Sequence, residues 1–253
     1  MVIARLAAMP LLRGALLLVS LAGAVRSARP CVAQAASPPD LPGIEGLPVV
    51  EIPATGPSGS LVAVILSGDG GWAAGDKQMA AALAEKGIPV VGFDSPSYLA
   101  VQRTPDGAAI DLGRLLQHYL SAWHKQQVLL IGYSHGADLA PFMVSRLSPE
   151  LRNRISLVAL LGLEDRASFE FHLADIVTEA HHAGDLPVLP EMQKLRGMAL
   201  LCVRGSNESK SLCSQLDSSL ARVETHAGGH RIAGDEGKDV VDLILSATRG
   251  WGS

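Results

Sequence analysis

The sequence predicts an α/β fold with a doubly wound, mostly parallel sheet and helices on both faces. Two observations predict it. Short apolar runs bounded by turn residues alternate along the chain with longer segments whose apolar residues recur at helical spacing. The runs are mostly apolar and do not alternate with polar residues, as expected of strands that are buried on both faces. Alternation of strand and helix favours a parallel sheet covered by helices, with right-handed crossovers.

The apolar runs that we predict to be strands are 61–66, 88–93, 128–131, 155–161 and 198–203, with a weaker one at 221–225. The predicted helices are 77–86, 106–123, 136–147 and 235–248. Gly87 is a natural C-cap for the first helix. The second helix carries one apolar stripe, formed by Leu112, Leu115, Leu116 and Tyr119. Residues 169–195 show no clean period, and we interpret them as an insertion over the sheet, in the position of a lid or a substrate wall.

The composition favours one globular domain and argues against nucleic-acid binding. The chain has 253 residues, of which 48% are hydrophobic and 18% charged, enough for one substantial core. The net charge is −4 and aromatic residues make up 4%, so neither a basic surface nor a base-stacking platform is predicted. We place the single domain at 48–253.

The N-terminus has the features of a secretory signal peptide. Arg5 and Arg13 precede the apolar stretch 14–24, which is short for a membrane span and leads to Ala33-Gln34-Ala35 as a cleavage site. We therefore predict a signal peptide at 1–35 and export; the alternative is an uncleaved N-terminal anchor. Residues 36–47 are rich in Pro, Ser and Gly and are predicted to be a flexible lead-in.

Cysteine usage agrees with export. Cleavage after Ala35 removes Cys31 and leaves Cys202 and Cys213 on either side of a short loop. In an oxidising compartment this pair is a credible disulfide; two unpaired buried thiols are the alternative. No neighbouring histidine or second pair completes a set of metal ligands, so we do not expect this cysteine pair to bind a metal. Nothing in the sequence requires a metal or an organic cofactor, and we predict neither.

The strongest local motif is Gly132-Tyr-Ser-His-Gly136, a G-x-S-x-G directly after a predicted strand and before a predicted helix. Such a turn holds its serine in a strained conformation at the carboxyl end of the sheet, where the helix N-terminus favours negative charge. This is the position of the nucleophile in the α/β-hydrolase fold, and it predicts Ser134 as a nucleophile. The alternative is a tight turn with Ser134 as a helix N-cap.

An acyl-transfer site also needs donors for an oxyanion. We assign one to the backbone N–H of His135. The other is expected in the glycine-rich loop 67–72, in the region of Asp69 and Gly70. A phosphate-binding loop is the competing interpretation, but a Walker lysine is missing from this sequence.

The base should follow the last strand, in the chain order Ser, acid, His. Gly228-Gly229-His230 lies there, and its glycines let the loop reach back over Ser134. His226 is the rival. The acid should follow the strand at 198–203, where Glu208 is the carboxylate of the loop between the two cysteines. Glu164 and Asp165, after the preceding strand, are the alternative.

With these segments in order, the chain resembles the bacterial virulence protein family typified by VirJ and the C-terminal half of AcvB. The matching segments are 66–72, 103–105 with Asp111, 132–138, 169–170, 190–191, the 202–213 loop and 228–230. The resemblance implies a periplasmic α/β-hydrolase that cleaves aminoacylated phospholipid, notably lysyl-phosphatidylglycerol, at the membrane surface. It also implies links to virulence and to secretion-system proteins. The sequence departs from the family at Arg204, Lys210 and Arg231.

A lysyl ester is dicationic, so its pocket should offer carboxylates. Asp69 and Asp138 are our candidates, although a structural hydrogen bond is an equal interpretation of Asp138. Two other functions stay open: a general carboxylesterase or thioesterase on the same fold, and a binding adaptor of a secretion system on a hydrolase scaffold.

Overall fold

The computed structural model describes residues 43–171, 182–232 and 236–250. The predicted signal peptide, most of the lead-in and the central part of the predicted lid segment lie outside these residues. Of the lead-in, residues 43–47 are described, and they are held in place. The Arg114 guanidinium donates to the Gly43 carbonyl oxygen at 2.6 and 3.0 Å, and Ile44 and Leu47 pack against the core. This end of the lead-in is therefore part of the folded domain.

A seven-stranded sheet forms the centre of the described residues. Its order is β1-β3-β2-β4-β5-β8-β9, with β1 antiparallel to β3 and every other pair parallel. The strands are β1 Val49–Ile52, β2 Leu61–Leu66, β3 Val90–Phe93, β4 Gln127–Tyr133, β5 Ile155–Leu161, β8 Leu200–Gly205 and β9 Arg222–His226. Two short strands, β6 Arg166–Ala167 and β7 Leu186–Pro187, pair separately.

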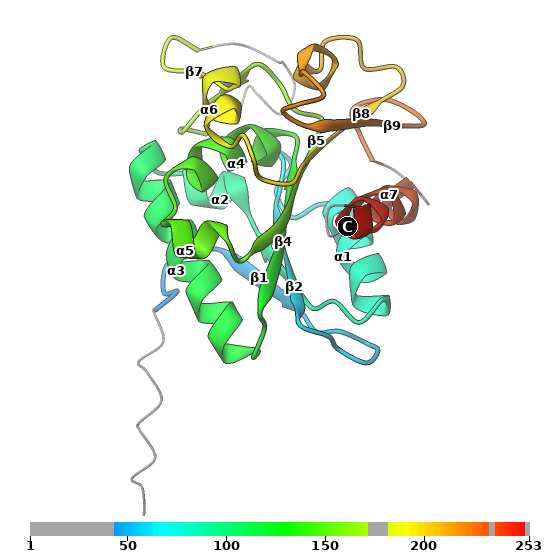
Figure 1. Cartoon of the computed structure of the whole chain (residues 1–253). Coiled ribbons are helices and arrows are strands. Elements are labelled where there is room, and N and C mark those ends of the chain that lie inside the picture. Colours follow the sequence, from blue (N-terminus) through cyan, green and yellow to red (C-terminus); the bar gives the residue numbers. More distant parts are fainter. Residues whose placement is uncertain (1–42, 172–181, 233–235, 251–253) are drawn as a thin grey trace, which may run out of the picture. The chain divides into compact units, whose positions relative to one another are not determined.

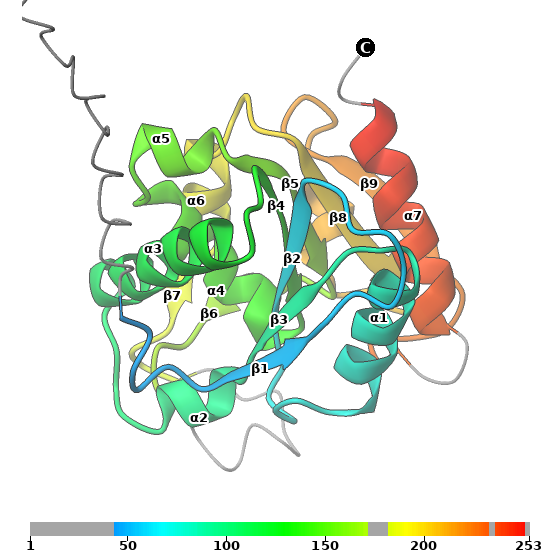
Figure 2. The ribbon, with the colours of Figure 1, turned by 90° about the horizontal axis from the view of Figure 1, so that it is seen from below.

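Helices cover both faces of this sheet, as predicted (Figures 1 and 2). On one face lie α1 Ala74–Glu85 and α7 Glu236–Gly250; on the other lie α3 Pro105–Ala122, α4 His135–Ser145 and α6 Leu189–Lys194. Two shorter helices are α2 Ser95–Leu99 and α5 Pro149–Arg152. The doubly wound α/β class is thereby confirmed. None of the described helices is both long and apolar enough to cross a bilayer.

The alternation of side chains along each strand explains the two cores. On β2, Val64 and Leu66 pack with the residues of α3 and α4, whereas Ala63 and Ile65 pack with those of α1 and α7. Successive side chains of a strand point to opposite faces, so an apolar run supplies both cores at once. This is why the buried strands are continuously apolar.

Local signals set the ends of the helices. Thr104 caps α3, its hydroxyl oxygen accepting from the Gly107 N–H at 3.1 Å, and Pro105 occupies the first position. Helix α1 begins three residues earlier than predicted, because the Asp76 carboxylate accepts from the Ala73 N–H at 3.1 Å. Gly87, with φ of +80°, follows its C-terminus as expected.

The segment predicted to be a lid is in part a crossover between β5 and β8. Residues 172–181 lie outside the described residues. The part that follows contains α6, which packs against α4, and Val188, Met192 and Leu195 are fully buried in the core. These last residues are therefore structural.

Candidate active site

Ser134 stands between β4 and α4 with φ of 52° and ψ of −126°, a conformation that is strained for a residue with a side chain. The motif glycines make this turn possible. A Cβ at Gly132 would collide with the backbone of Gly136 and Ala137, and one at Gly136 would collide with the carbonyl of Leu66 on β2. The Ser134 hydroxyl makes no capping bond to α4. The geometry therefore differs from that of a serine N-cap.

The Ser134 hydroxyl meets the His230 imidazole instead. The distance from Ser134 Oγ to His230 Nε2 is 2.8 Å, and from His230 Nδ1 to Glu208 Oε1 it is 2.7 Å. Because a carboxylate only accepts, Nδ1 carries the ring proton and Nε2 offers its lone pair to the serine hydroxyl. The structure thus brings together the three residues that sequence analysis named as nucleophile, base and acid.

Glu208 is held as an anion. Burial by itself would raise the pKa of Glu208, but the hydrogen bonds with His230 and with the Gly205 N–H, at 2.9 Å, lower the pKa below its usual value. The Arg204 guanidinium approaches the carbonyl oxygens of Gly205 and Glu208 at 3.4 and 3.3 Å. Arg204, one of the positions at which the sequence departs from the family, therefore contacts the backbone of the loop that carries Glu208.

The glycine-rich loop after β2 lies against the nucleophile. A Cβ at Gly68 would stand 2.9 Å from Ser134 Cβ and 3.4 Å from Ser134 Oγ. The loop then turns tightly, with the Gly71 N–H donating to the Gly68 carbonyl at 3.0 Å. Asp69 and Gly70, the expected second donors, are the central residues of this turn beside Ser134.

The His135 ring connects that loop to another segment. Its Nδ1 lies 3.3 Å from Asp69 Oδ1, and its Nε2 lies 2.9 Å from the Ser168 carbonyl oxygen. His135 also begins α4, where backbone N–H groups lack intrahelical acceptors. Its backbone is thus available as the predicted donor, while its side chain pairs with the Asp69 carboxylate.

Asp138 is placed differently from our first interpretation. Its side chain is buried, and Oδ1 accepts from the Glu164 N–H at 2.7 Å. Burial, followed by the charge of Glu164, raises the pKa of Asp138 well above its usual value. The carboxyl therefore ties α4 to the loop after β5. This is the structural alternative, and an exposure of 3% leaves Asp138 little surface for contact with a lysyl group.

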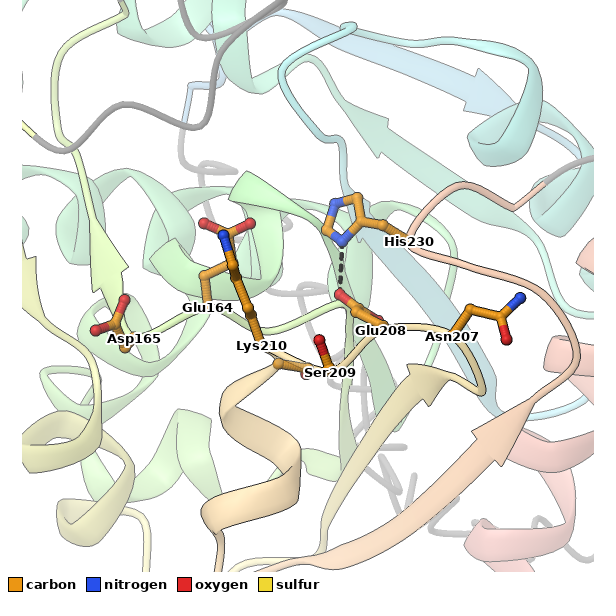
Figure 3. A pocket seen from close by; sticks show the side chains of 8 residues that line it. Glu164, Asp165, Asn207, Glu208, Ser209, Lys210 and His230 are labelled. Carbon is orange, nitrogen blue, oxygen red and sulfur yellow. Dashed lines mark hydrogen bonds and ion pairs between the residues drawn. The ribbon is translucent and has the colours of Figure 1, made fainter.

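A pocket adjoins His230 and Glu208 (Figure 3). Its volume is about 310 Å³, and it is lined by Glu164, Asp165, Asn207, Glu208, Ser209, Lys210, Ser211 and His230. Three of these side chains are carboxylates and one is an ammonium group. Glu164 and Asp165, the alternative acids of the sequence analysis, thus lie at the site, whereas Glu208 takes the hydrogen bond to His230.

The cysteine pair is bonded. Cys202, within β8, and Cys213 form a disulfide with a Cα–Cα distance of 5.5 Å, and both are buried. It closes the loop that carries Glu208. The rival base His226 is buried, and its Nδ1 lies 2.6 Å from the Ala227 carbonyl oxygen. Within residues 43–171, 182–232 and 236–250, no group of three His, Cys, Asp or Glu side chains could hold a metal ion.

Sequence analysis missed two contributors to the site. Tyr133 places its hydroxyl 3.0 Å from the Ile232 nitrogen and 3.4 Å from the His230 carbonyl oxygen. Gly162, with φ of +66°, lies so close to His230 that a Cβ would stand 2.8 Å from the ring. Tyr133 stands within the motif, but nothing local indicates a contact with residues nearly a hundred positions away. Gly162 directly follows a predicted strand, and a glycine at that place in the sequence could have indicated a close approach by another side chain.

A family model described as "Bacterial virulence protein (VirJ)" matches residues 60–250. No curated protein sequence matches the chain.

Several solved structures are similar to this chain. The thioesterase domain from the curacin biosynthetic pathway is 16% identical with a TM-score of 0.53, over 78% of this chain and 94% of that one. Est1E from Butyrivibrio proteoclasticus is 11% identical with a TM-score of 0.57, over 81% of this chain and 96% of that one. MenH from S. aureus is 12% identical with a TM-score of 0.58, over 81% of this chain and 99% of that one. At these identities the likeness shows a shared α/β-hydrolase fold.

Proposed function

This chain belongs to the VirJ family of bacterial virulence proteins, and from that premise we propose that it is a periplasmic serine hydrolase. Its proposed reaction is cleavage of the aminoacyl ester of aminoacylated phospholipid, in particular lysyl-phosphatidylglycerol. One observation carries the proposal of hydrolysis. His230 lies between Glu208 Oε1, at 2.7 Å, and Oγ of Ser134, at 2.8 Å, and Ser134 stands on a strained turn at the carboxyl end of β4. The substrate follows from the family resemblance and from the charge of the pocket.

In the proposed reaction, Ser134 Oγ attacks the ester carbonyl that joins lysine to the glycerol headgroup, while His230 Nε2 takes the serine proton. The N–H of His135 and that of Asp69 or Gly70 stabilise the oxyanion. The intermediate collapses, His230 protonates the leaving alcohol, and lysyl-Ser134 remains. Water, deprotonated by His230, then attacks this acyl-enzyme; the bond from the acyl carbon to Ser134 Oγ breaks, His230 returns its proton to Oγ, and lysine is released. Glu208 holds the ring in the required tautomer throughout.

The pocket supports a cationic acyl group. Glu164 is half-buried and Asp165 exposed beside His230, so their carboxylates replace Asp138 as partners for the two ammonium groups of a lysyl ester. Asp69 remains a further candidate, although its carboxylate also contacts His135. Lys210 opposes this charge from the same pocket.

Two features support the proposed compartment. The buried Cys202–Cys213 disulfide belongs to a protein that folds under oxidising conditions, as in the bacterial periplasm. The N-terminal residues have the composition of a signal peptide. Mass spectrometry of the protein recovered from a periplasmic extract would test both, since a mature N-terminus at Ala36 and intact disulfide are expected.

The direct test is release of free lysine from vesicles containing lysyl-phosphatidylglycerol, by wild type and by Ser134→Ala. We expect release by wild type and its loss in the variant. Release by neither protein, with the fold verified by circular dichroism, would contradict the lipid substrate. Faster hydrolysis of short acyl esters or thioesters would then favour a general esterase, and no hydrolysis of any ester would favour an adaptor of a secretion system.

A second experiment tests the charge of the pocket. Glu164→Gln should lower kcat/KM for a lysyl ester about tenfold, because one ion pair at the pocket rim contributes on the order of 1 kcal/mol. It should leave kcat/KM for an uncharged acyl ester unchanged. Lys210→Gln should raise kcat/KM for the lysyl ester. Glu150→Gln, on α5, is the control at a distance from the pocket. Equal losses on both esters would show that Glu164 does not select charge.

A further inference from the structure

The residue before the nucleophile contacts the loop that carries the base. The Tyr133 hydroxyl accepts a hydrogen bond from the Ile232 N–H at 3.0 Å and donates to the His230 carbonyl oxygen at 3.4 Å. It therefore bonds the backbone at His230 and again two residues later. The Tyr133 and His230 rings also lie nearly parallel, with centroids 6.3 Å apart and an interplanar angle of 24°.

The loop needs such a contact because of its sequence. It enters through Gly228 and Gly229, residues with wide conformational freedom, and Gly228 has φ of +100°. On that side it is held by the loop after β8, where the Asn207 N–H donates to the Gly228 carbonyl at 2.9 Å. On the far side of His230, the Tyr133 hydroxyl accepts from the Ile232 N–H. His230 thus lies between a contact with the loop after β8 and a contact with Tyr133.

Tyr133 connects the turn that holds Ser134 with the loop that carries His230. It ends β4, and its backbone is continuous with the strained turn that fixes Ser134. Its ring is partly buried and lies against α1, where a Cβ at Gly75 would stand 3.5 Å from the ring and 3.1 Å from the Ile232 carbonyl oxygen. A displacement of the Ser134 turn would therefore carry Tyr133, and with it the His230 loop, in the same direction.

We propose that the Tyr133 hydroxyl is a positioning group that holds the His230 loop so that Nε2 stays aligned with Ser134 Oγ and Nδ1 with Glu208. This inference rests on the proposed hydrolysis by Ser134, His230 and Glu208. Tyr133 touches no reacting atom and acts through His230. Small losses of alignment are costly in such a site, because a displacement of about 1 Å can cost up to about a hundredfold in rate.

The test is Tyr133→Phe, which removes the hydroxyl and keeps the ring. We expect kcat for a p-nitrophenyl ester to fall about tenfold with KM unchanged, since substrate contacts remain. In the proton NMR spectrum, the downfield Nδ1–H resonance of His230, identified by its loss in His230→Ala, should broaden or disappear in Tyr133→Phe. Tyr119→Phe is the matched control, because it removes a buried hydroxyl that bonds Glu51 at 2.7 Å, away from the site.

Three outcomes would overturn the proposal: a kcat within twofold of wild type with an unchanged resonance, an equal fall in kcat in Tyr119→Phe, or a rise in KM alone. The NMR readout needs no turnover, so it decides the position of His230 even if no ester is hydrolysed and the proposed function fails. Should Tyr133→Phe not fold, hydrogen exchange in wild type decides. The Ile232 amide should be protected, and rapid exchange there would contradict the bond.

Discussion

Gly162 shows how closely the residues around His230 are fitted. It follows β5 with φ of +66°, and a Cβ there would stand 2.8 Å from the His230 ring carbon Cε1. Gly162→Ala should therefore displace the ring and lower kcat at least about tenfold, with KM little changed. The measurement is steady-state hydrolysis of an ester beside a thermal unfolding curve.

The control for this variant is Gly197→Ala. Gly197 also has a positive φ, +93°, but a Cβ there meets nothing within 4 Å. Both variants should lose about 1–2 kcal/mol of stability from backbone strain, and only Gly162→Ala should lose activity. If both lose kcat equally, the effect comes from stability and not from contact with His230.

At the residue scale, the geometry could be predicted from sequence where a motif states it. The strand–G-x-S-x-G–helix pattern and the late Gly-Gly-His predicted that Ser134 and His230 come together, and the two side chains lie in hydrogen-bond contact. Asp138 was ambiguous, because its distance from Ser134 in sequence does not report whether a carboxyl is buried. Its bond to the Glu164 N–H depends on how the loop after β5 packs, which no local pattern encodes.

The first turn of α1 contains a carboxyl with an unusual titration. Asp76 is buried, and burial, the largest cause, raises its pKa from 3.8 to about 6; the charge of Asp94 adds to this. The folded protein therefore keeps the proton between about pH 4 and pH 6, where the unfolded chain has lost it. Stability from this group is present at low pH and is lost as pH rises through about 6.

Asp76→Asn should remove this dependence. The amide oxygen can still accept from the Ala73 N–H, but it does not titrate. Between about pH 4 and pH 6, the free energy of unfolding of wild type should fall by about 3 kcal/mol relative to the variant. Urea unfolding at several pH values measures the difference. Asp239→Asn, an exposed change in the first turn of α7, should leave the pH dependence of the free energy of unfolding as in wild type. If the difference between wild type and Asp76→Asn does not change with pH, the raised pKa of Asp76 is contradicted.

At the element scale, the buried elements could be predicted and the marginal ones could not. Strands β2 and β5 have the predicted bounds, because short, mostly apolar runs bounded by turn residues favour strands that are buried on both faces. The edge strand β1 was missed, since its four residues are only partly buried and carry Glu51. The short helices α2, α5 and α6 are set by caps and tertiary packing, and therefore leave little periodicity.

At the scale of the whole molecule, parallel topology collects the site. The loops after β2, β4, β5, β8 and β9 all leave the same edge of the sheet, so Gly68, Ser134, Gly162, Glu208 and His230 meet although they are far apart in sequence. This convergence could be predicted from the order of strands and helices. The carboxylates of the pocket could not be distinguished in the same way, because they lie on loops whose paths depend on contacts with one another.

The disulfide links this architecture to the site, since it joins β8 to the end of the loop that carries Glu208. It closes a sequence separation of 11 residues, for which loop entropy corresponds to about 3 kcal/mol. The same purified chain should therefore unfold in urea with a free energy lower by about that amount when dithiothreitol is present. Comparing one chain in two redox states avoids the cavity that a cysteine substitution would leave.

Reduction should also affect catalysis. Glu208 is held by the Gly205 N–H and by His230, and a loosened loop would weaken the support of the imidazolium that forms during attack. We expect kcat of the reduced protein to fall well below that of the oxidised protein at a temperature where both are folded. Since both sulfurs are buried, the bond must first be opened by unfolding in reductant and refolding. Full activity in the refolded, reduced protein would show that the hydrogen bonds alone hold Glu208, and that the disulfide serves only the stability of the fold.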